Sequence, residues 1–241
     1  MLGGVNLMLF ESADTAATLP RTDRRARHLL GVLRRQVGGE FDAGVVNGPR
    51  GKGTLIAVRS DEIDLELAWS TPTPPLDPVT LLVGLPRPQT ARDILREATA
   101  LGVGALHFFS PEKGEASYAR SSLWTSGEWR RLLVSGAEQA FDTRLPEVTH
   151  GRGLAEIVAQ LPAHGSRIAF DNYESPRPLS ATTVTAPVIL AFGPERGWSA
   201  GERGLLRAKA FDFAHLGTRV LRSETAVIAA VSLVKTRLGL L

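Results

Sequence analysis

The chain has 241 residues, of which 43% are hydrophobic and 22% charged, and its formal net charge is +3. Enough apolar material is present for a packed core, which excludes a disordered chain, and no apolar run approaches the roughly 20 residues of a membrane span. With no cysteine and only five scattered histidines, disulfides and zinc sites of the usual kinds are excluded, so we expect no metal. The N-terminal residues lack the features of a signal peptide, so we expect a cytoplasmic protein.

The first 70 residues have mostly the pattern of β-strands. Short, partly alternating runs are separated by glycine-rich turns, and they predict strands at residues 2–10, 40–46, 53–59 and 63–69. Residues 24–37 differ, because their apolar side chains recur at helical spacing. The simplest fold that this pattern predicts is a small β-barrel that carries one basic helix.

A basic segment coincides with this helix. Residues 21–35 contain one acidic residue, Asp23, and six arginines, which are Arg21, Arg24, Arg25, Arg27, Arg34 and Arg35. Such a segment is either a solvated helix face or a patch that contacts the phosphate backbone of a nucleic acid. The composition alone leaves both interpretations open.

A proline-rich stretch divides the chain. Residues 70–78 (STPTPPLDP) contain four prolines, which favour an extended, semi-rigid linker. We therefore predict a barrel domain at residues 1–70, a linker at 71–78 and a larger domain at 79–241.

Strands and helices alternate after the linker. Apolar runs predict buried strands at residues 79–85, 106–109, 167–171 and 188–192, and helical spacing predicts helices at 90–101, 128–141 and 226–238. Gly102 is expected to end the first of these helices. The last helix is apolar over most of its length and should be largely enclosed. This order predicts an α/β domain with a mostly parallel sheet.

Two segments lie where ligands bind in open α/β sheets, beyond the ends of strands. In residues 193–199 (GPERGWS), Gly193 and Pro194 favour a tight turn and Gly197 allows close backbone approach to a ligand. Ser199 and Glu202 have the spacing of a capping box, which predicts a helix start. Exposed amides at this turn are suited to a polar cofactor.

The second segment, residues 216–226 (LGTRVLRSETA), places arginines, hydroxyls and Glu224 before the last helix. It is either a helix cap, with Ser223 or Thr225 closing the helix and Glu224 on its dipole, or part of a ligand site. No G-x-G-x-x-G, phosphate-binding loop or nucleophile elbow is present, which argues against nicotinamide enzymes, Rossmann-type methyltransferases and common hydrolases.

These two segments together resemble the GPEGG…LGxRILRxETA signature of the RsmE family, the 16S ribosomal RNA uridine-N3 methyltransferases of the SPOUT superfamily. Three further stretches resemble family patterns in the same order, namely residues 28–41 (HLLGVLRRQVGGEF), 92–103 (RDILREATALGV) and 137–146, which begin with Ala-Glu-Gln. The resemblance covers nearly the whole chain, and its most specific part is the C-terminal pair of segments.

The resemblance implies a PUA-like barrel that binds RNA, followed by a SPOUT domain with a C-terminal trefoil knot, and a homodimer that completes the site. It implies S-adenosylmethionine as the cofactor, 16S ribosomal RNA as the partner, and no metal. The implied cofactor-binding residues are Leu85, Phe192, Gly193, Pro194, Glu195, Gly197, Leu216, Gly217, Leu221, Ser223, Thr225 and Ala226. Removal of the uridine N3 proton needs a base, so the candidates for a base or orienting group are Glu224 and Glu195, and Arg222 is the candidate to hold the target. Glu195 is alternatively only a brace of its turn.

Three positions depart from the family pattern, and one of them is the usual glutamate of the E-L-G-V helix end, which is Thr99 or Ala100 here. Arg196 replaces the second glycine of the GPEGG turn, and Asp142 stands where an arginine is usual. The alternatives are a SPOUT ribose 2′-O-methyltransferase and a non-catalytic RNA-binding protein that has kept the fold.

Overall fold

The computed structural model describes residues 7–241, and the chain divides into two compact units. The first unit contains the residues up to Pro75 together with Val134–Leu145, and the second contains Leu76–Leu133 and Pro146–Leu241. The chain between Thr71 and Asp77 forms no helix or strand, as its prolines favour. The predicted first strand lies partly in residues 2–6, which are outside the described residues. Its described end forms β1.

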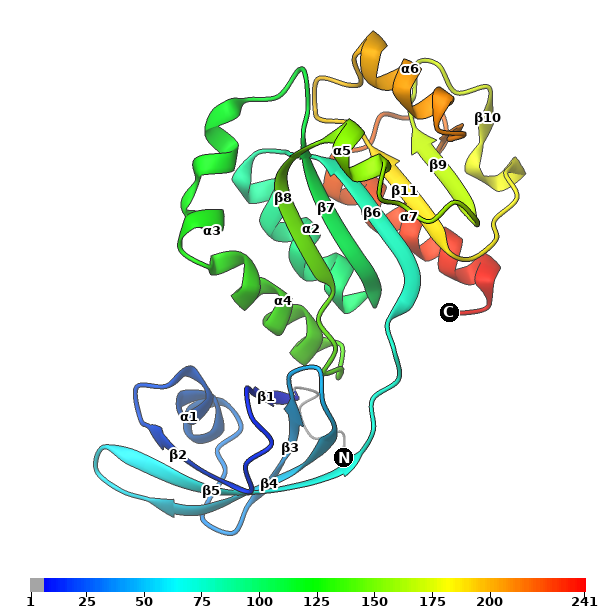
Figure 1. Ribbon diagram of the computed structural model, residues 1–241. Helices are drawn as coiled ribbons and strands as arrows, with labels where there is room; N and C mark the ends of the chain where they lie inside the picture. The colour runs from blue at the N-terminus through cyan, green and yellow to red at the C-terminus, as the bar shows by residue number, and fades with distance from the viewer. Residues whose placement is uncertain (1–6) are drawn as a thin grey trace. The chain divides into compact units, whose positions relative to one another are not determined.

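The N-terminal unit is built on a five-stranded sheet with the order β1-β3-β4-β5-β2 (Figure 1). Its strands are β1 (Met8–Phe10), β2 (Ala16–Pro20), β3 (Glu40–Val45), β4 (Arg50–Val58) and β5 (Glu62–Thr71). Among the strand pairs of the described residues in this unit, only β1–β3 is parallel. The sheet curls around a core that includes Phe41, Leu55 and Ile63, so it forms a half-barrel with β1 and β2 at its two edges.

The basic helix is shorter than its apolar spacing predicted. It consists of α1 (Arg24–Arg27) and the π-helical segment η1 (His28–Val32). The wider π-helical turn brings the amide of Leu33 to the carbonyl of His28 at 2.9 Å, and Arg34 then adopts a positive φ of 50°. The chain leaves the helix there, so Val37, which was expected on the buried face, is 61% exposed.

The C-terminal unit contains a seven-stranded sheet with the order β10-β12-β9-β11-β6-β7-β8, in which every pair is parallel. Its strands are β6 (Asp77–Gly84), β7 (Val103–Ser110), β8 (Glu147–Gly153), β9 (Ser166–Phe170), β10 (Arg177–Pro178), β11 (Val188–Phe192) and β12 (Asp212–His215). The predicted parallel α/β sheet is therefore confirmed. The sequence pattern did not indicate β8 and β10, which are exposed or short.

Helices cover both faces of this sheet (Figure 1). They are α2 (Pro88–Ala100), the 3₁₀ segment η2 (Ala116–Arg120), α3 (Ser122–Thr125), α4 (Glu128–Gln139), α5 (Leu154–Val158), the 3₁₀ segment η3 (Leu179–Ala181), α6 (Ala200–Ala208) and α7 (Ser223–Leu238). Helices α2 and α7 pack together on one face. Leu154 of α5 and Leu206 of α6 belong to a core cluster with strand residues such as Ile189. Among residues 7–241, no helix combines the length and apolar character that a membrane crossing needs.

Helix α7 differs from its sequence prediction at its start and on its outer face. It begins at Ser223, its N-cap is Arg222, and no side chain caps it, so neither Ser223 nor Thr225 is the cap. Val227 and Val231 are buried, but Ile228 is 36% and Leu233 51% exposed. The apolar residues of α7 occupy every face of the helix, but only one face packs against α2 and the sheet. The helix is therefore enclosed on one side only.

Candidate functional site

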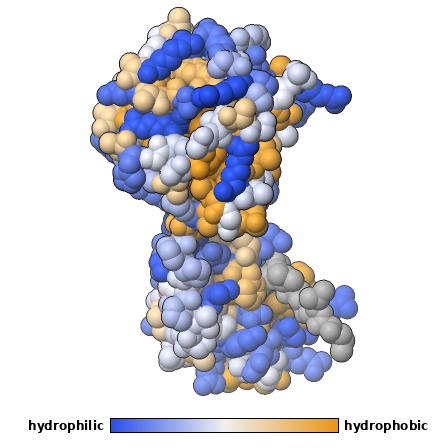
Figure 2. Space-filling view, turned by 90° about the vertical axis from the view of Figure 1, so that its right-hand side faces the viewer, coloured by the Kyte–Doolittle hydropathy of each residue, from blue (hydrophilic) through white to orange (hydrophobic). Residues whose placement is uncertain are grey.

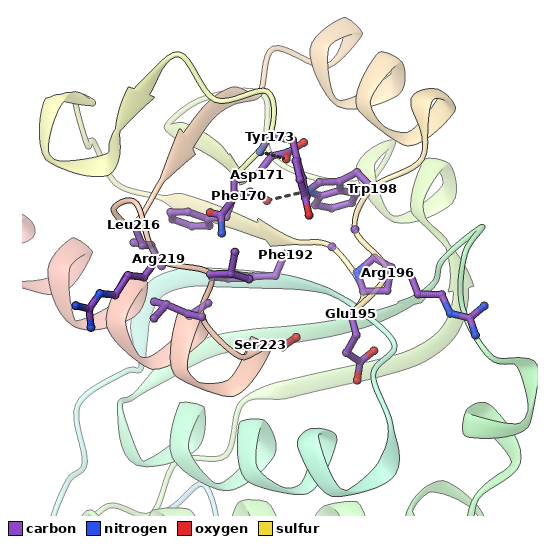
Figure 3. Close-up of a pocket in the computed structure, with 17 residues that line it drawn as sticks. Phe170, Asp171, Tyr173, Phe192, Glu195, Arg196, Trp198, Leu216, Arg219 and Ser223 are labelled. Carbon is purple, nitrogen blue, oxygen red and sulfur yellow. Dashed lines mark hydrogen bonds between the residues drawn. The ribbon is translucent and has the colours of Figure 1, made fainter.

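A pocket of about 240 Å³ lies at the carboxyl ends of β9 and β11, where ligands bind in sheets of this kind (Figure 3). Three loops form it: one after β9, one after β11, and one between β12 and α7. Together with the adjoining ends of β9, β11 and α7, they contribute Phe170, Asp171, Asn172, Tyr173, Phe192, Gly193, Pro194, Glu195, Arg196, Gly197, Trp198, Leu216, Arg219, Val220, Leu221, Ser223 and Ala226.

The loop after β11 is fixed by short-range interactions. The amide of Gly197 donates to the carbonyl of Pro194 at 2.8 Å, and Gly197 has a φ of 70°, which an L side chain rarely adopts. Ser199 then begins α6 with the predicted capping box, since its hydroxyl accepts from the amide of Glu202 while the Glu202 carboxylate accepts from the amide of Ser199. The turn and the helix start hold the loop from both ends.

Trp198 joins the loop after β11 to the loop after β9. Trp198 is 2% exposed, and its ring stacks on Phe109 with ring centroids 5.7 Å apart. Its Nε1 donates to the carbonyl oxygen of Phe170 at 2.8 Å, a hydrogen bond that Figure 3 marks. Beside it, Phe170 and Phe192 stack with centroids 4.8 Å apart. Two walls of the pocket are thus formed by aromatic side chains, and the contacts among these side chains hold the two loops together.

An ion pair behind the pocket strengthens this connection. Nε of Arg203, in α6, lies 2.6 Å from Oδ2 of Asp171, and the two side chains are only 13% and 2% exposed. Arg203 Nη1 also donates to the carbonyl of Trp198 at 3.1 Å. The hydrogen bond to Asp171 raises the pKa of Arg203 above its usual value. Separating the two side chains would leave a buried charge without a partner, which is energetically costly. The pair therefore holds Asp171 in position at the pocket wall.

A second pocket, of about 540 Å³, adjoins the first. The two pockets share Pro194, Glu195, Arg196, Val220, Leu221 and Ser223. The second pocket is also lined by Leu85, Arg87, Thr90, Lys113, Gly114, Glu115, Tyr118, Arg222 and Glu224. A ligand in one pocket would therefore lie directly beside a ligand in the other.

The two candidate carboxylates differ in their surroundings. Oε1 of Glu195 accepts from the backbone amide of Arg87 at 3.1 Å, which ties the loop after β11 to the start of α2. Glu224 lies in the first turn of α7, and within the described residues its carboxylate has no hydrogen-bond partner. Glu195 thus braces its loop through a hydrogen bond. Glu224 makes no such bond within the described residues, and it lines the second pocket together with Arg222.

The structure brings most of the predicted cofactor residues to these pockets. Of those expected at the cofactor, the first pocket is lined by Phe192, Gly193, Pro194, Glu195, Gly197, Leu216, Leu221, Ser223 and Ala226. Leu85 lines only the second pocket, and Gly217 and Thr225 line neither. Arg196, which departs from the family turn, points away from the first pocket and does not fill it (Figure 3).

Sequence reasoning missed the loop after β9 and the far side of the second pocket. Asp171 and Tyr173 of that loop line the first pocket, and Lys113 and Tyr118 line the second. Asp171 ends a predicted buried strand, so the rule that ligands bind beyond strand ends could have identified it. Lys113 and Tyr118 lie in a segment with no regular pattern, and no sequence signal pointed to them.

The six arginines of the basic segment are not equivalent. Arg24 forms two hydrogen bonds of 2.8 Å with the Glu138 carboxylate, and Arg25 pairs with Asp23 at 2.9 Å. Arg21 donates to the carbonyl of Arg59. Arg27 and Arg34 are exposed, whereas Arg35 is half-buried.

Within the described residues, His, Asp and Glu side chains nowhere form a group of three that could hold a metal ion.

The fold and the paired pockets agree with a family comparison. Residues 72–235 match the model of the RNA methyltransferase domain, which covers the whole parallel sheet and both pockets. The class of protein is therefore that of the RNA methyltransferases. A ribosomal RNA small subunit methyltransferase E from Treponema pallidum is 31% identical over 95% of this chain and 90% of its own length. The chain belongs to the ribosomal RNA small subunit methyltransferase E family.

Other relatives and solved structures are similar to this chain over nearly its whole length. A protein of the same name from Synechocystis is 29% identical over 90% of this chain and 72% of its own length. The crystal structure of a ribosomal RNA small subunit methyltransferase E from Neisseria gonorrhoeae, bound to S-adenosyl methionine, has a TM-score of 0.79 at 21% identity over 96% of this chain and 97% of that chain. A probable rRNA-methyltransferase from Porphyromonas gingivalis has a TM-score of 0.81 at 20% identity, with 97% and 98% covered. At these identities, both likenesses concern the fold.

Proposed function

We propose that this chain is an S-adenosylmethionine-dependent methyltransferase that methylates N3 of a uridine in 16S ribosomal RNA. The observation that carries the proposal is the pair of adjoining pockets, which share the loop after β11 and the segment before α7. In the proposal, the cofactor occupies the first pocket and the target uracil the second. Membership of the family supports both assignments.

The residues of the first pocket fit this cofactor. The stacked rings of Phe170 and Phe192 offer apolar faces to an adenine ring. A Cβ on Gly193 would lie 3.2 Å from the ring of Trp198, so a larger residue here would press on the ring that joins the two loops. Backbone groups of three loops surround the pocket, and they are suited to the polar edges of the cofactor. When bound, S-adenosylmethionine supplies an electrophilic methyl group on a sulfonium sulfur.

The residues of the second pocket fit the target base. Uridine N3 carries a weakly acidic proton, which must leave before or as N3 forms its bond to the methyl carbon. In the proposed mechanism the free carboxylate of Glu224 accepts this proton. The guanidinium of Arg222 donates hydrogen bonds to a uracil oxygen and stabilises the negative charge that develops there. Glu195 holds the shared loop through the amide of Arg87.

A second copy of the chain is proposed to complete the site. Val220 is 78% exposed and lines both pockets, while Ile228 and Leu233 are exposed on α7. Figure 2 views the side of the C-terminal unit on which α7 ends and shows apolar surface there. In the proposed homodimer, the second copy covers Val220 at the rim of both pockets. The trefoil knot expected in this region of the chain remains part of the proposal.

The N-terminal unit is proposed to bind the RNA backbone through the basic segment. Because Arg27 and Arg34 are exposed, they are the members best placed to meet phosphates. Replacing both with alanine should weaken RNA binding and reduce the steepness of log K against log salt by about 1–2. Fewer phosphates are then neutralised on binding, so fewer counterions leave the RNA. Fluorescence anisotropy over a salt series measures the slope. Arg177→Ala, an exposed arginine of the other unit, serves as the control. An unchanged slope would remove the segment from the interface.

The proposed reaction is tested by identifying its product. The purified chain is incubated with S-adenosylmethionine and 16S ribosomal RNA, free or in assembled small subunits, and the RNA is digested to nucleosides for mass spectrometry. We expect one 3-methyluridine per RNA. A ribose-methylated nucleoside would favour the 2′-O-methyltransferase instead. If the chain bound RNA but neither bound the cofactor in calorimetry nor transferred methyl groups, the non-catalytic alternative would replace the proposal.

A further inference from the structure

A third pocket, of about 330 Å³, lies within the N-terminal unit. It is formed by β1, by the basic segment α1–η1, and by the end of α4. Two stretches that resemble the family, residues 28–41 and 137–146, meet here, although the proposed reaction gives neither a role. The volume falls at the lower end of the ~300–1,000 Å³ of small-molecule sites.

The charges around this pocket are internally balanced. Both guanidinium Nη atoms of Arg24 are hydrogen-bonded to Glu138, whose Oε1 also accepts from the amide of Leu9 at 3.1 Å. Arg25 is paired with Asp23 and lies over the ring of Phe10. Two cations with two carboxylate partners leave little excess charge for a free anion. The pocket therefore favours a ligand that is recognised through hydrogen bonds and flat apolar contact.

Uncharged polar groups supply such hydrogen bonds. Ser135 and Gln139 are exposed, line the pocket, and lie one turn apart on α4. Nε2 of His28 is buried and lacks a hydrogen-bond partner within the described residues, and its ring also lines the pocket. A hydroxyl, a carboxamide and an imidazole together provide both donors and acceptors. Unpaired nucleobases present this combination on their edges.

We propose that this pocket takes one unstacked base of the RNA, separate from the base that is methylated. The inference rests on the proposed function, because it assumes that the substrate is RNA. The base edge meets Ser135, Gln139 and His28, and the exposed Arg27 on the same basic segment meets the adjoining phosphate. Such a site adds sequence selection to a unit that would otherwise contact only the backbone.

Nuclear magnetic resonance of the ¹⁵N-labelled full chain tests the pocket directly. The four ribonucleoside 5′-monophosphates are titrated in turn, and the side-chain amide signal of Gln139 is assigned from its loss in Gln139→Ala. We expect at least one nucleotide to shift this signal and the Ser135 backbone amide to saturation. Ribose 5-phosphate, which lacks a base, should leave both unchanged. Equal shifts with ribose 5-phosphate, or no saturable shift with any nucleotide, would overturn the proposal.

RNA affinity provides the second measurement. Ser135→Ala and Gln139→Ala remove exposed groups that make no core contact, so both variants should fold. Each should raise the Kd for 16S ribosomal RNA by about 3–10-fold, the usual effect of one lost hydrogen bond. Gln160→Ala, an exposed glutamine of the C-terminal unit, should leave this Kd unchanged. All three variants should bind S-adenosylmethionine like the unaltered chain. Failure of the unaltered chain to bind this cofactor would count against the proposed reaction, whereas an unchanged Kd for RNA in both Ser135→Ala and Gln139→Ala would count against this pocket.

Discussion

Replacing Glu224 with glutamine should lower the rate of methyl transfer by about 10²–10⁴-fold, which is the usual contribution of a general base. The substitution keeps the size of the side chain and removes its ability to accept a proton. The Kd for S-adenosylmethionine should stay the same, because Glu224 lines the second pocket and not the first. Single-turnover transfer of a labelled methyl group to 16S ribosomal RNA measures the rate, and calorimetry measures cofactor affinity.

Two further variants separate the roles within this site. Arg222→Ala should also preserve cofactor binding and reduce transfer by about 10²–10³-fold, as loss of a charge-stabilising donor does. Glu195→Ala removes the side-chain oxygen that accepts from the amide of Arg87, at a position that lines both pockets. It should therefore weaken cofactor binding and transfer together. Transfer at the unaltered rate in both Arg222→Ala and Glu224→Gln, with intact cofactor binding, would contradict the catalytic assignment.

Replacing Gly84 with alanine should displace the loop that both pockets share. Gly84 ends β6, and a Cβ there would lie 2.7 Å from the backbone nitrogen of Pro194 and 2.8 Å from its Cδ. Since backbone and a proline ring cannot move aside like a flexible side chain, the loop after β11 must shift. We expect a loss of about 1–3 kcal/mol in the free energy of unfolding, typical of overpacking, and at least ~10-fold weaker binding of S-adenosylmethionine.

Gly204→Ala is the matched control for this substitution. Gly204 lies inside α6, and nothing stands within 4 Å of a Cβ added there. Alanine at this position should stabilise the helix by about 0.5–1 kcal/mol and leave cofactor affinity unchanged. Urea unfolding and calorimetry on both variants make the comparison. If Gly84→Ala bound the cofactor like the unaltered chain, the close approach of β6 to the loop would have no role in shaping the pocket.

Local sequence determined the framework of the C-terminal unit. The continuous apolar run of β11 predicted a strand covered on both faces, and its predicted bounds of residues 188–192 are those observed. Ser199 and Glu202 specified the start of α6, because a capping box involves residues only three positions apart. The turn at Gly193–Gly197 was also predicted, and the pocket forms around it. Each of these features depends on contacts between near neighbours in the chain.

Tertiary structure decided which side chains meet. The Asp171–Arg203 pair joins residues 32 positions apart, and Arg24 meets Glu138 across 114 positions. No periodicity encodes such pairs, because they arise only when the sheet and helices are assembled. The same holds for α7, whose apolar residues predicted burial while the sheet covers one face only. The sequence by itself determined the parallel sheet and the two loops that resemble the family. The pocket walls, the partners of the arginines and the third pocket depend on long-range packing, which local pattern does not determine.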